Sequence, residues 1–174
     1  RERSCCTIPS KPSTTTAITS ALFRARSDRI IDQFAPQSLP SRCLDPYHDA
    51  IATDPLSRHW VERNVTPHRQ EGYASVTVSL KAHGQTPGDA SADQMRRVAK
   101  IAEVFGFNEI RVSHQQNLVL PHVSQADLPA VHRQLGGVGL DTPNIGLVSD
   151  LIACPGMDYC ALATARSIPI GQTI

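Results

Sequence analysis

The fold is decided by the stretch "NEIRVSHQQNLVLPHV", residues 108–123. Short stretches rich in apolar residues lie on both sides of the polar run His114-Gln115-Gln116. This pattern predicts two short strands, residues 109–113 and 117–123, joined by a turn. Upstream, the stretch "GYASVTVSLK", residues 72–81, alternates with a period of two. It predicts another strand with one buried face.

Two helices are predicted around these strands. Ser91 is expected to cap the first, because apolar residues follow it at helical spacing as far as Gly106. The second is expected to run from a Ser124 cap to Gly136. The order is therefore strand, helix, strand, strand, helix. This order is typical of an α+β fold in which a small, mostly antiparallel sheet carries helices on one face.

Charge and apolar content exclude two classes of partner. The 174 residues include 17 Lys and Arg against 16 Asp and Glu, which is not the basic footprint of a nucleic-acid binder. No apolar run approaches the roughly 20 residues of a membrane span, so we expect neither nucleic acid nor membrane as a partner. The five cysteines do not follow the spacing of a disulfide framework, which favours a reducing, cytoplasmic location.

The first 43 residues differ in composition from the rest, being rich in Ser, Thr, Pro and Arg. We interpret residues 1–43 as a disordered or non-homologous leader, and a transit peptide is the alternative. Their cysteines, Cys5, Cys6 and Cys43, are interpreted as non-ligands. After the leader, a short helix is expected over residues 57–64, capped by Asp54 or Ser57 and anchored to the core by Trp60.

The remaining two cysteines lie in "LIACPGMDYCALATARSIPI", residues 151–170. Pro155 disfavours helical geometry at Cys154, and Gly156 allows an unusual turn, so Cys154 is expected on a bend. Cys160 is expected to open a helix, where the helix dipole favours a thiolate. Thiolates bind iron–sulfur clusters and zinc. Two buried structural cysteines are the alternative.

Together, the strand stretch and the cysteine stretch resemble the nitrite/sulfite reductase family, most closely its sulfite reductase hemoproteins. The family's half domain contains the pattern Arg-x-Ser/Thr-x-x-Gln-Asn, which is matched here by Arg111, Ser113, Gln116 and Asn117. Its Cys-x5-Cys loop is matched by Cys154 and Cys160. The resemblance implies a ferredoxin-like half domain over residues 44–140. It also implies that residues 141–174 begin a segment that binds siroheme and an iron–sulfur cluster.

The resemblance further implies a redox enzyme that carries siroheme and a [4Fe–4S] cluster. Cys154 and Cys160 would be metal ligands, and Arg111, Gln116 and Asn117 would bind cofactor, with Arg166 as a further candidate. The implied reaction is the six-electron reduction of sulfite to sulfide, with nitrite reduction to ammonia as the alternative. The oxyanion would be the substrate, and ferredoxin or a flavoprotein would donate electrons. The resemblance assigns no catalytic residue in this chain.

The sequence also departs from the family pattern. The later Cys-x3-Cys pair that would complete the cluster does not occur in it, and no upstream half domain is recognisable. We therefore expect the chain to be a fragment that is inactive alone. Two other classes remain open. One is a non-catalytic ferredoxin-like module, and the other is a zinc-binding protein that uses Cys154 and Cys160 with His114 and His132.

Overall fold

The computed structural model describes residues 27–28, 38–41 and 54–174. The chain divides into two units, Arg1–Pro40 and Ser41–Ile174. The predicted leader, residues 1–43, lies almost entirely outside the described residues, and so do Cys5, Cys6 and Cys43. Every helix and strand named below belongs to the second unit.

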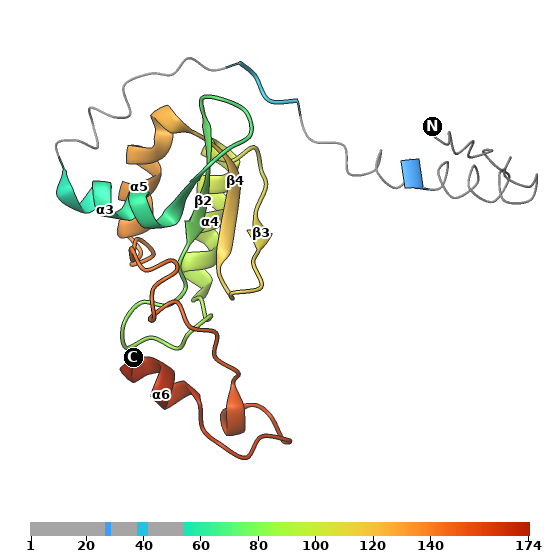
Figure 1. Ribbon diagram of the computed structural model, residues 1–174, viewed down its shortest axis with the longest axis vertical. Helices are drawn as coiled ribbons and strands as arrows, with labels where there is room; N and C mark the ends of the chain where they lie inside the picture. The colour runs from blue at the N-terminus through green and yellow to red at the C-terminus, as the bar shows by residue number, and fades with distance from the viewer. Residues whose placement is uncertain (1–26, 29–37, 42–53) are drawn as a thin grey trace, which may run out of the picture. The chain divides into compact units, whose positions relative to one another are not determined.

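A four-stranded antiparallel sheet forms the centre of this unit (Figure 1). Its strands lie in the order β1 (Val65–Pro67), β2 (Tyr73–Val78), β4 (Leu118–Ser124) and β3 (Arg111–Val112). The three predicted strands are confirmed, although β2 ends before Lys81 and β3 has only two residues. Strand β1 was not predicted. It is short, lies at the sheet edge and contains Pro67, so it has none of the alternation that marks β2.

Two of the three predicted helices begin directly after their predicted capping residues. Helix α3 (Pro55–Asn64) is capped by the Asp54 carboxylate, which accepts hydrogen bonds from Leu56 N and Ser57 N. Helix α4 (Ala92–Phe105) begins with a capping box between Ser91 and Gln94. The Ser124 cap is wrong, because its side chain makes no capping hydrogen bond. A 3-10 turn, η1 (Gln125–Asp127), comes between it and helix α5 (Leu128–Gly136), which has a proline in its first turn.

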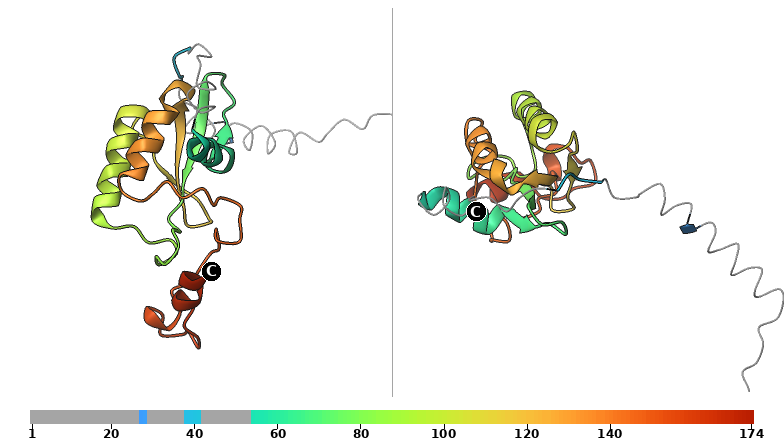
Figure 2. Two further views of the ribbon diagram at one scale, coloured as in Figure 1. Left: turned by 90° about the vertical axis from the view of Figure 1, so that its left-hand side faces the viewer. Right: turned by 90° about the horizontal axis from the view of Figure 1, so that it is seen from above.

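Helices α4 and α5 pack side by side over one face of the sheet (Figures 1 and 2). Their apolar residues and those of the sheet form one core. Its fully buried members include Val76, Val78, Leu120 and Val123 from the sheet, Val98 and Ile101 from α4, and Val131 and Leu135 from α5. Each such side chain contributes about 1.5–3 kcal/mol by leaving water. Trp60 of α3 joins the core as predicted and is 1% exposed.

The chain beyond α5 contains a 3-10 turn, η2 (Gly156–Asp158), and one short helix, α6 (Ile168–Thr173). This segment runs beside the loop that follows β2, and the Gln172 side chain donates to Thr86 Oγ1 (Figure 1). The helix expected from Cys160 is wrong, because residues 160–167 form turns instead. Met157 N donates to Ala165 O at 3.0 Å, and the Ser167 hydroxyl donates to Cys154 O. These bonds fold the alanine-rich stretch back and override its helix propensity.

Candidate functional site

The cysteine loop turns at Gly156, as the sequence predicts. Gly156 has a φ of 60°, in the left-handed region. A Cβ at this position would lie 2.6 Å from Ser167 Oγ and 2.7 Å from Ala165 O, so only glycine fits. Cys160 N donates to Gly156 O at 2.9 Å and closes the turn on its far side. The loop between the two cysteines is therefore a defined turn.

Both cysteines of this loop are free thiols that solvent can reach. Cys154 is exposed, and Cys160 is half-buried. Accessible thiols on a tight loop suit metal ligation better than buried, inert cysteines do. Within residues 54–174 no three His, Cys, Asp or Glu side chains gather into a metal-binding group. The loop thus offers a pair of free thiols, which could supply two of the four thiolate ligands of an iron–sulfur cluster.

Among residues 54–174 the structure does not gather the zinc set that joins this pair to two histidines. His114 is exposed in the β3–β4 turn. His132 lies on α5, where its Nδ1 is 3.0 Å from Ser57 Oγ and its ring stacks on Trp60 at 4.6 Å. Burial lowers the pKa of His132, although Asp141 and Asp54 oppose this effect. His132 therefore belongs to the packing of α3 against α5.

Gln116 contacts the residue that precedes the first cysteine. Its carboxamide makes two hydrogen bonds to the backbone of Ala153, donating to the carbonyl oxygen and accepting from the amide, each at 3.0 Å. Gln116 itself has a φ of 58°. Gly88 lies close by, since a Cβ there would come within 3.1 Å of Gln116 Cβ. A hollow of about 150 Å³ lies beside this contact and is also lined by Pro155.

Asn117 belongs to a buried polar cluster with Lys81 and Asp150. Asp150 accepts from Lys81 Nζ at 2.7 Å, from Asn117 Nδ2 at 2.8 Å and from Gly146 N at 3.0 Å. The Lys81 side chain is 1% exposed and that of Asp150 is 8% exposed. Lys81 also donates to the Gln115 carbonyl oxygen. Burial raises the pKa of Asp150, but the hydrogen bonds from Lys81, Asn117 and Gly146 outweigh it and lower the pKa overall.

Arg111 lies on the edge strand β3, and its guanidinium pairs with Glu109. Arg111 Nε is 2.6 Å from Glu109 Oε1, and the arginine side chain is 58% exposed. The same carboxylate begins a row of side chains. His122 Nε2 lies 3.3 Å from Glu109 Oε2, and His122 Nδ1 lies 3.1 Å from His68 Nε2. Burial lowers the pKa of His122, against the opposing charge of Glu109.

Ser113, the remaining residue of the motif, and the further candidate Arg166 have simpler surroundings. Ser113 holds the β3–β4 turn, because its backbone and hydroxyl both bond to the backbone of Asn117. Arg166 is 71% exposed, with its Nε 3.9 Å from Asp158. Arg111 therefore contacts Glu109, whereas Gln116 and Asn117 contact the segment that leads to Cys154.

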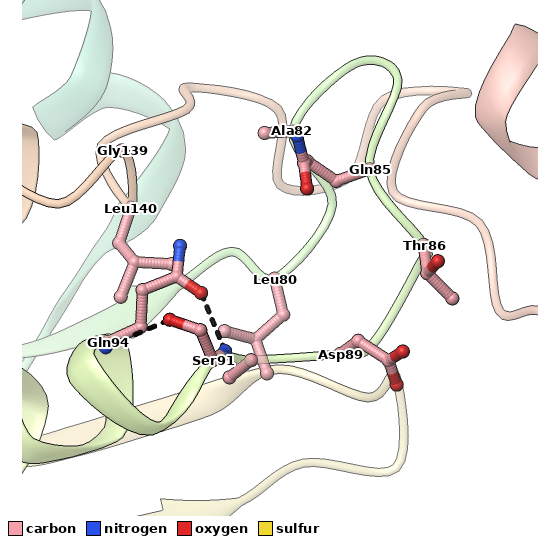
Figure 3. A pocket seen from close by; sticks show the side chains of 10 residues that line it. Leu80, Ala82, Gln85, Thr86, Asp89, Ser91, Gln94, Gly139 and Leu140 are labelled. Carbon is pink, nitrogen blue, oxygen red and sulfur yellow. Dashed lines mark hydrogen bonds between the residues drawn. The ribbon is translucent and has the colours of Figure 1, made fainter.

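A separate hollow of about 190 Å³ lies between the loop after β2 and the start of α4 (Figure 3). Ser91 and Gln94 in its wall bond to each other in the capping box. The hollow is also lined by Leu80, Leu140 and Asp89. Two of its polar side chains are thus engaged in starting the helix, and neither Cys154 nor Cys160 lines it.

Sequence reasoning missed Lys81 and Asp150. Lys81 follows an alternating strand in "VSLK", where a lysine ordinarily marks the end of burial. Its partner lies 69 residues away, and no local pattern connects the two. The one available hint was an aspartate that lies shortly before a cysteine, in a segment without helix or strand signals.

The sheet with two helices on one face defines this unit as a ferredoxin-like half domain. Residues 66–138 match the family model described as the nitrite/sulfite reductase ferredoxin-like half domain. Residues 66–138 are thus similar to a half domain of the nitrite/sulfite reductase family, and the family resemblance seen in the sequence is confirmed over this part of the chain.

Relatives carry names from both branches of this family. The chain is 29% identical over 134 residues to the chloroplastic ferredoxin–nitrite reductase of Betula pendula, covering 72% of this chain and 22% of that protein. It is 25% identical to the ferredoxin–nitrite reductase of Synechococcus elongatus, covering 83% and 29%. It is 26% identical to sulfite reductase [ferredoxin] 2 of Mycolicibacterium paratuberculosis, covering 71% and 24%. The matched region is therefore less than a third of each relative.

Among the residues that the structure describes, no helix is both long enough and apolar enough to cross a bilayer.

Proposed function

We propose that this chain contributes to an oxidoreductase that reduces nitrite or sulfite with siroheme and a [4Fe–4S] cluster. Cys154 and Cys160 supply two of the cluster's thiolate ligands in this proposal. The observation that carries it is the pair of free, accessible thiols on one tight loop, tied to a half domain of the nitrite/sulfite reductase family. When bound, the siroheme and cluster supply the iron and the electrons for reduction of the oxyanion.

In this proposal the residues of the chain bind the cofactor and orient the cysteine loop. Arg111 is more than half exposed, so its guanidinium can leave Glu109 and form two parallel hydrogen bonds with a cofactor carboxylate. Gln116 and Asn117 support the cysteine loop instead, because their carboxamides bond to Ala153 and Asp150. In this proposal Arg111 contacts the cofactor directly, whereas Gln116 and Asn117 act through the loop.

Nitrite is the first candidate substrate and sulfite the second. The ferredoxin–nitrite reductase names of the Betula and Synechococcus relatives support nitrite, and the name of the Mycolicibacterium relative supports sulfite. The same names support ferredoxin as the electron donor, with a flavoprotein as the alternative. We propose the cytoplasm as the location. The alternative is the chloroplast, for which the Betula relative is named, and a fluorescent fusion of the chain distinguishes the two.

Anaerobic reconstitution tests the ligand pair. The chain is incubated with iron, sulfide and a small thiol that completes the coordination, and visible absorption and bound iron are measured. We expect a broad thiolate-to-iron band that is lost in Cys154→Ser and in Cys160→Ser but kept in the matched variant Cys43→Ser. Absorption that survives both loop substitutions would contradict the proposal. The rate at which the siroheme-loaded enzyme oxidises reduced methyl viologen is then measured with nitrite and with sulfite. The anion that supports the faster oxidation is identified as the substrate.

A further inference from the structure

The segment between α5 and the cysteine loop is attached to the sheet by side chains. Residues 140–155 form neither helix nor strand, so no regular backbone ladder fixes them. Buried or half-buried side chains replace it, and four of them hold the part of the segment that leads to Cys154. They are Lys81 and Asn117, which flank the ends of β2 and β4, Asp150 in the segment itself, and Gln116 in the preceding turn. We call these four residues the latch.

The latch holds the segment at two points close to Cys154. At the first, Lys81 and Asn117 bond to the Asp150 carboxylate at 2.7 and 2.8 Å. At the second, the Gln116 carboxamide pairs with both backbone groups of Ala153. The two points lie three residues apart, and Cys154 follows directly after the second. The position of its backbone is therefore set by the sheet, although no strand reaches it.

The latch is more elaborate than attachment of a loop requires. Its ion pair is buried, and a buried ion pair is an inefficient way to gain stability compared with apolar residues of the same volume. Such a pair does fix one geometry, because both charges must remain partnered. Asn117 adds to this by bonding Leu80 N as well as Asp150, which joins the end of β2 to the segment.

We propose that the latch residues Lys81, Gln116, Asn117 and Asp150 are positioning residues that preorganise Cys154 for binding metal together with Cys160. This inference rests on the proposed function, because it takes the two thiolates as a ligand pair. The inference extends the proposed function by giving Gln116 and Asn117 a role through the cysteine loop. It also adds Lys81 and Asp150, which lie outside the family patterns matched in the sequence. Preorganisation of ligands raises affinity by lowering the entropy that binding must offset.

Cadmium binding to the full 174-residue chain tests the latch. In a background with Cys5, Cys6 and Cys43 changed to Ser, Cys154 and Cys160 are the only thiols. Charge-transfer absorption between sulfur and Cd²⁺ counts the thiolates bound, and titration gives the affinity. Gln116→Met keeps the size of the side chain but loses both bonds to Ala153. Gln115→Met, one residue earlier in the same turn, is the matched control.

We expect Gln116→Met to weaken paired-thiolate Cd²⁺ binding about tenfold, which corresponds to about 1.4 kcal/mol, while Gln115→Met leaves it unchanged. Hydrogen exchange of the Ala153 amide, read by NMR, should accelerate in Gln116→Met while the amides of β2 and β4 stay protected. Unchanged Cd²⁺ affinity in Gln116→Met would overturn the latch and leave the proposed ligand pair intact. A parent chain that does not bind Cd²⁺ through both thiols would overturn the ligand pair and the latch together.

Discussion

Substitution of Lys81 by Met should destabilise the fold far more than the same substitution at a surface lysine. Lys81→Met keeps the length of the side chain but removes the ammonium group that lies 2.7 Å from Asp150. The carboxylate of Asp150 is only 8% exposed and would be left as a buried charge without its countercharge. Breaking a buried pair from one side costs about 3–5 kcal/mol.

The matched control is Lys100→Met on helix α4. Lys100 pairs with Glu103 at 2.9 Å, a similar distance, but both side chains are about 60% exposed. Water screens this pair, so its removal should cost only about 0.3–0.5 kcal/mol. The two lysines therefore differ in burial far more than in contact distance. A comparison between them isolates the effect of desolvation.

Thermal unfolding followed by circular dichroism measures the difference. For a chain of this size 1 kcal/mol shifts Tm by about 2–4 °C, so Lys81→Met should lower Tm by about 6–20 °C. The double variant Lys81→Met/Asp150→Leu should regain much of the loss, because it leaves no unpaired charge. The lowered pKa of Asp150 means that its pairing stabilises the fold above the ordinary value of 3.8 and is lost as pH falls through the lowered pKa. Equal Tm values for Lys81→Met and Lys100→Met would refute the reasoning.

Three further outcomes are expected. The pKa of His122 lies below its ordinary value of 6.5 because the ring is buried. The unfolded chain therefore binds more protons, and the stability of the fold should decrease as pH drops below about 6.5. An NMR titration that gives His122 a pKa above 6.5 would contradict this. Gly156→Ala should rearrange the cysteine loop and change the rate at which Ellman's reagent labels Cys154. Gly84→Ala should leave this rate unchanged, because Gly84 also has a left-handed backbone but a Cβ there would meet nothing within 4 Å. Equal labelling rates in the two variants would count against the steric argument. Finally, the 174-residue chain alone should not oxidise reduced methyl viologen with nitrite or sulfite. Residues 54–174 contain the two free thiols but gather no group of three or more metal-ligating side chains. Measurable turnover would contradict this prediction.

Most helices and strands of the half domain could be predicted from short sequence patterns. The period of two in β2 and the capping pattern at Ser91 each specify their element within a few neighbouring residues. Strand β1 could not be found in this way, because it exists only through its pairing with β2. The alanine-rich run after Cys160 was predicted to be helical, but the bonds of the loop to Ala165 and Ser167 decide its conformation.

The sequence named candidate site residues, whose roles stay a proposal, but it did not reveal their contacts. The family resemblance implied that Cys154 and Cys160 form a ligand loop, and the unusual turn expected at Gly156 is present, since this residue has a left-handed backbone. The partners of Gln116 and Asn117 lie 37 and 33 residues further along the chain. Pairing over such distances depends on how the half domain folds, so sequence spacing alone could not reveal it.

The row of His68, His122 and Glu109 has a fixed order of protons. A backbone N–H can only donate, and Gln70 N lies 2.9 Å from His68 Nδ1, so that nitrogen carries no proton. His68 then holds its proton on Nε2 and donates it to His122 Nδ1, and His122 holds its own on Nε2, toward Glu109. Reversing either ring would set two protons or two lone pairs against each other. The Gln70 peptide group thereby selects the tautomers of both imidazoles. The proton of His68 then points to His122, and the proton of His122 points to the carboxylate of Glu109.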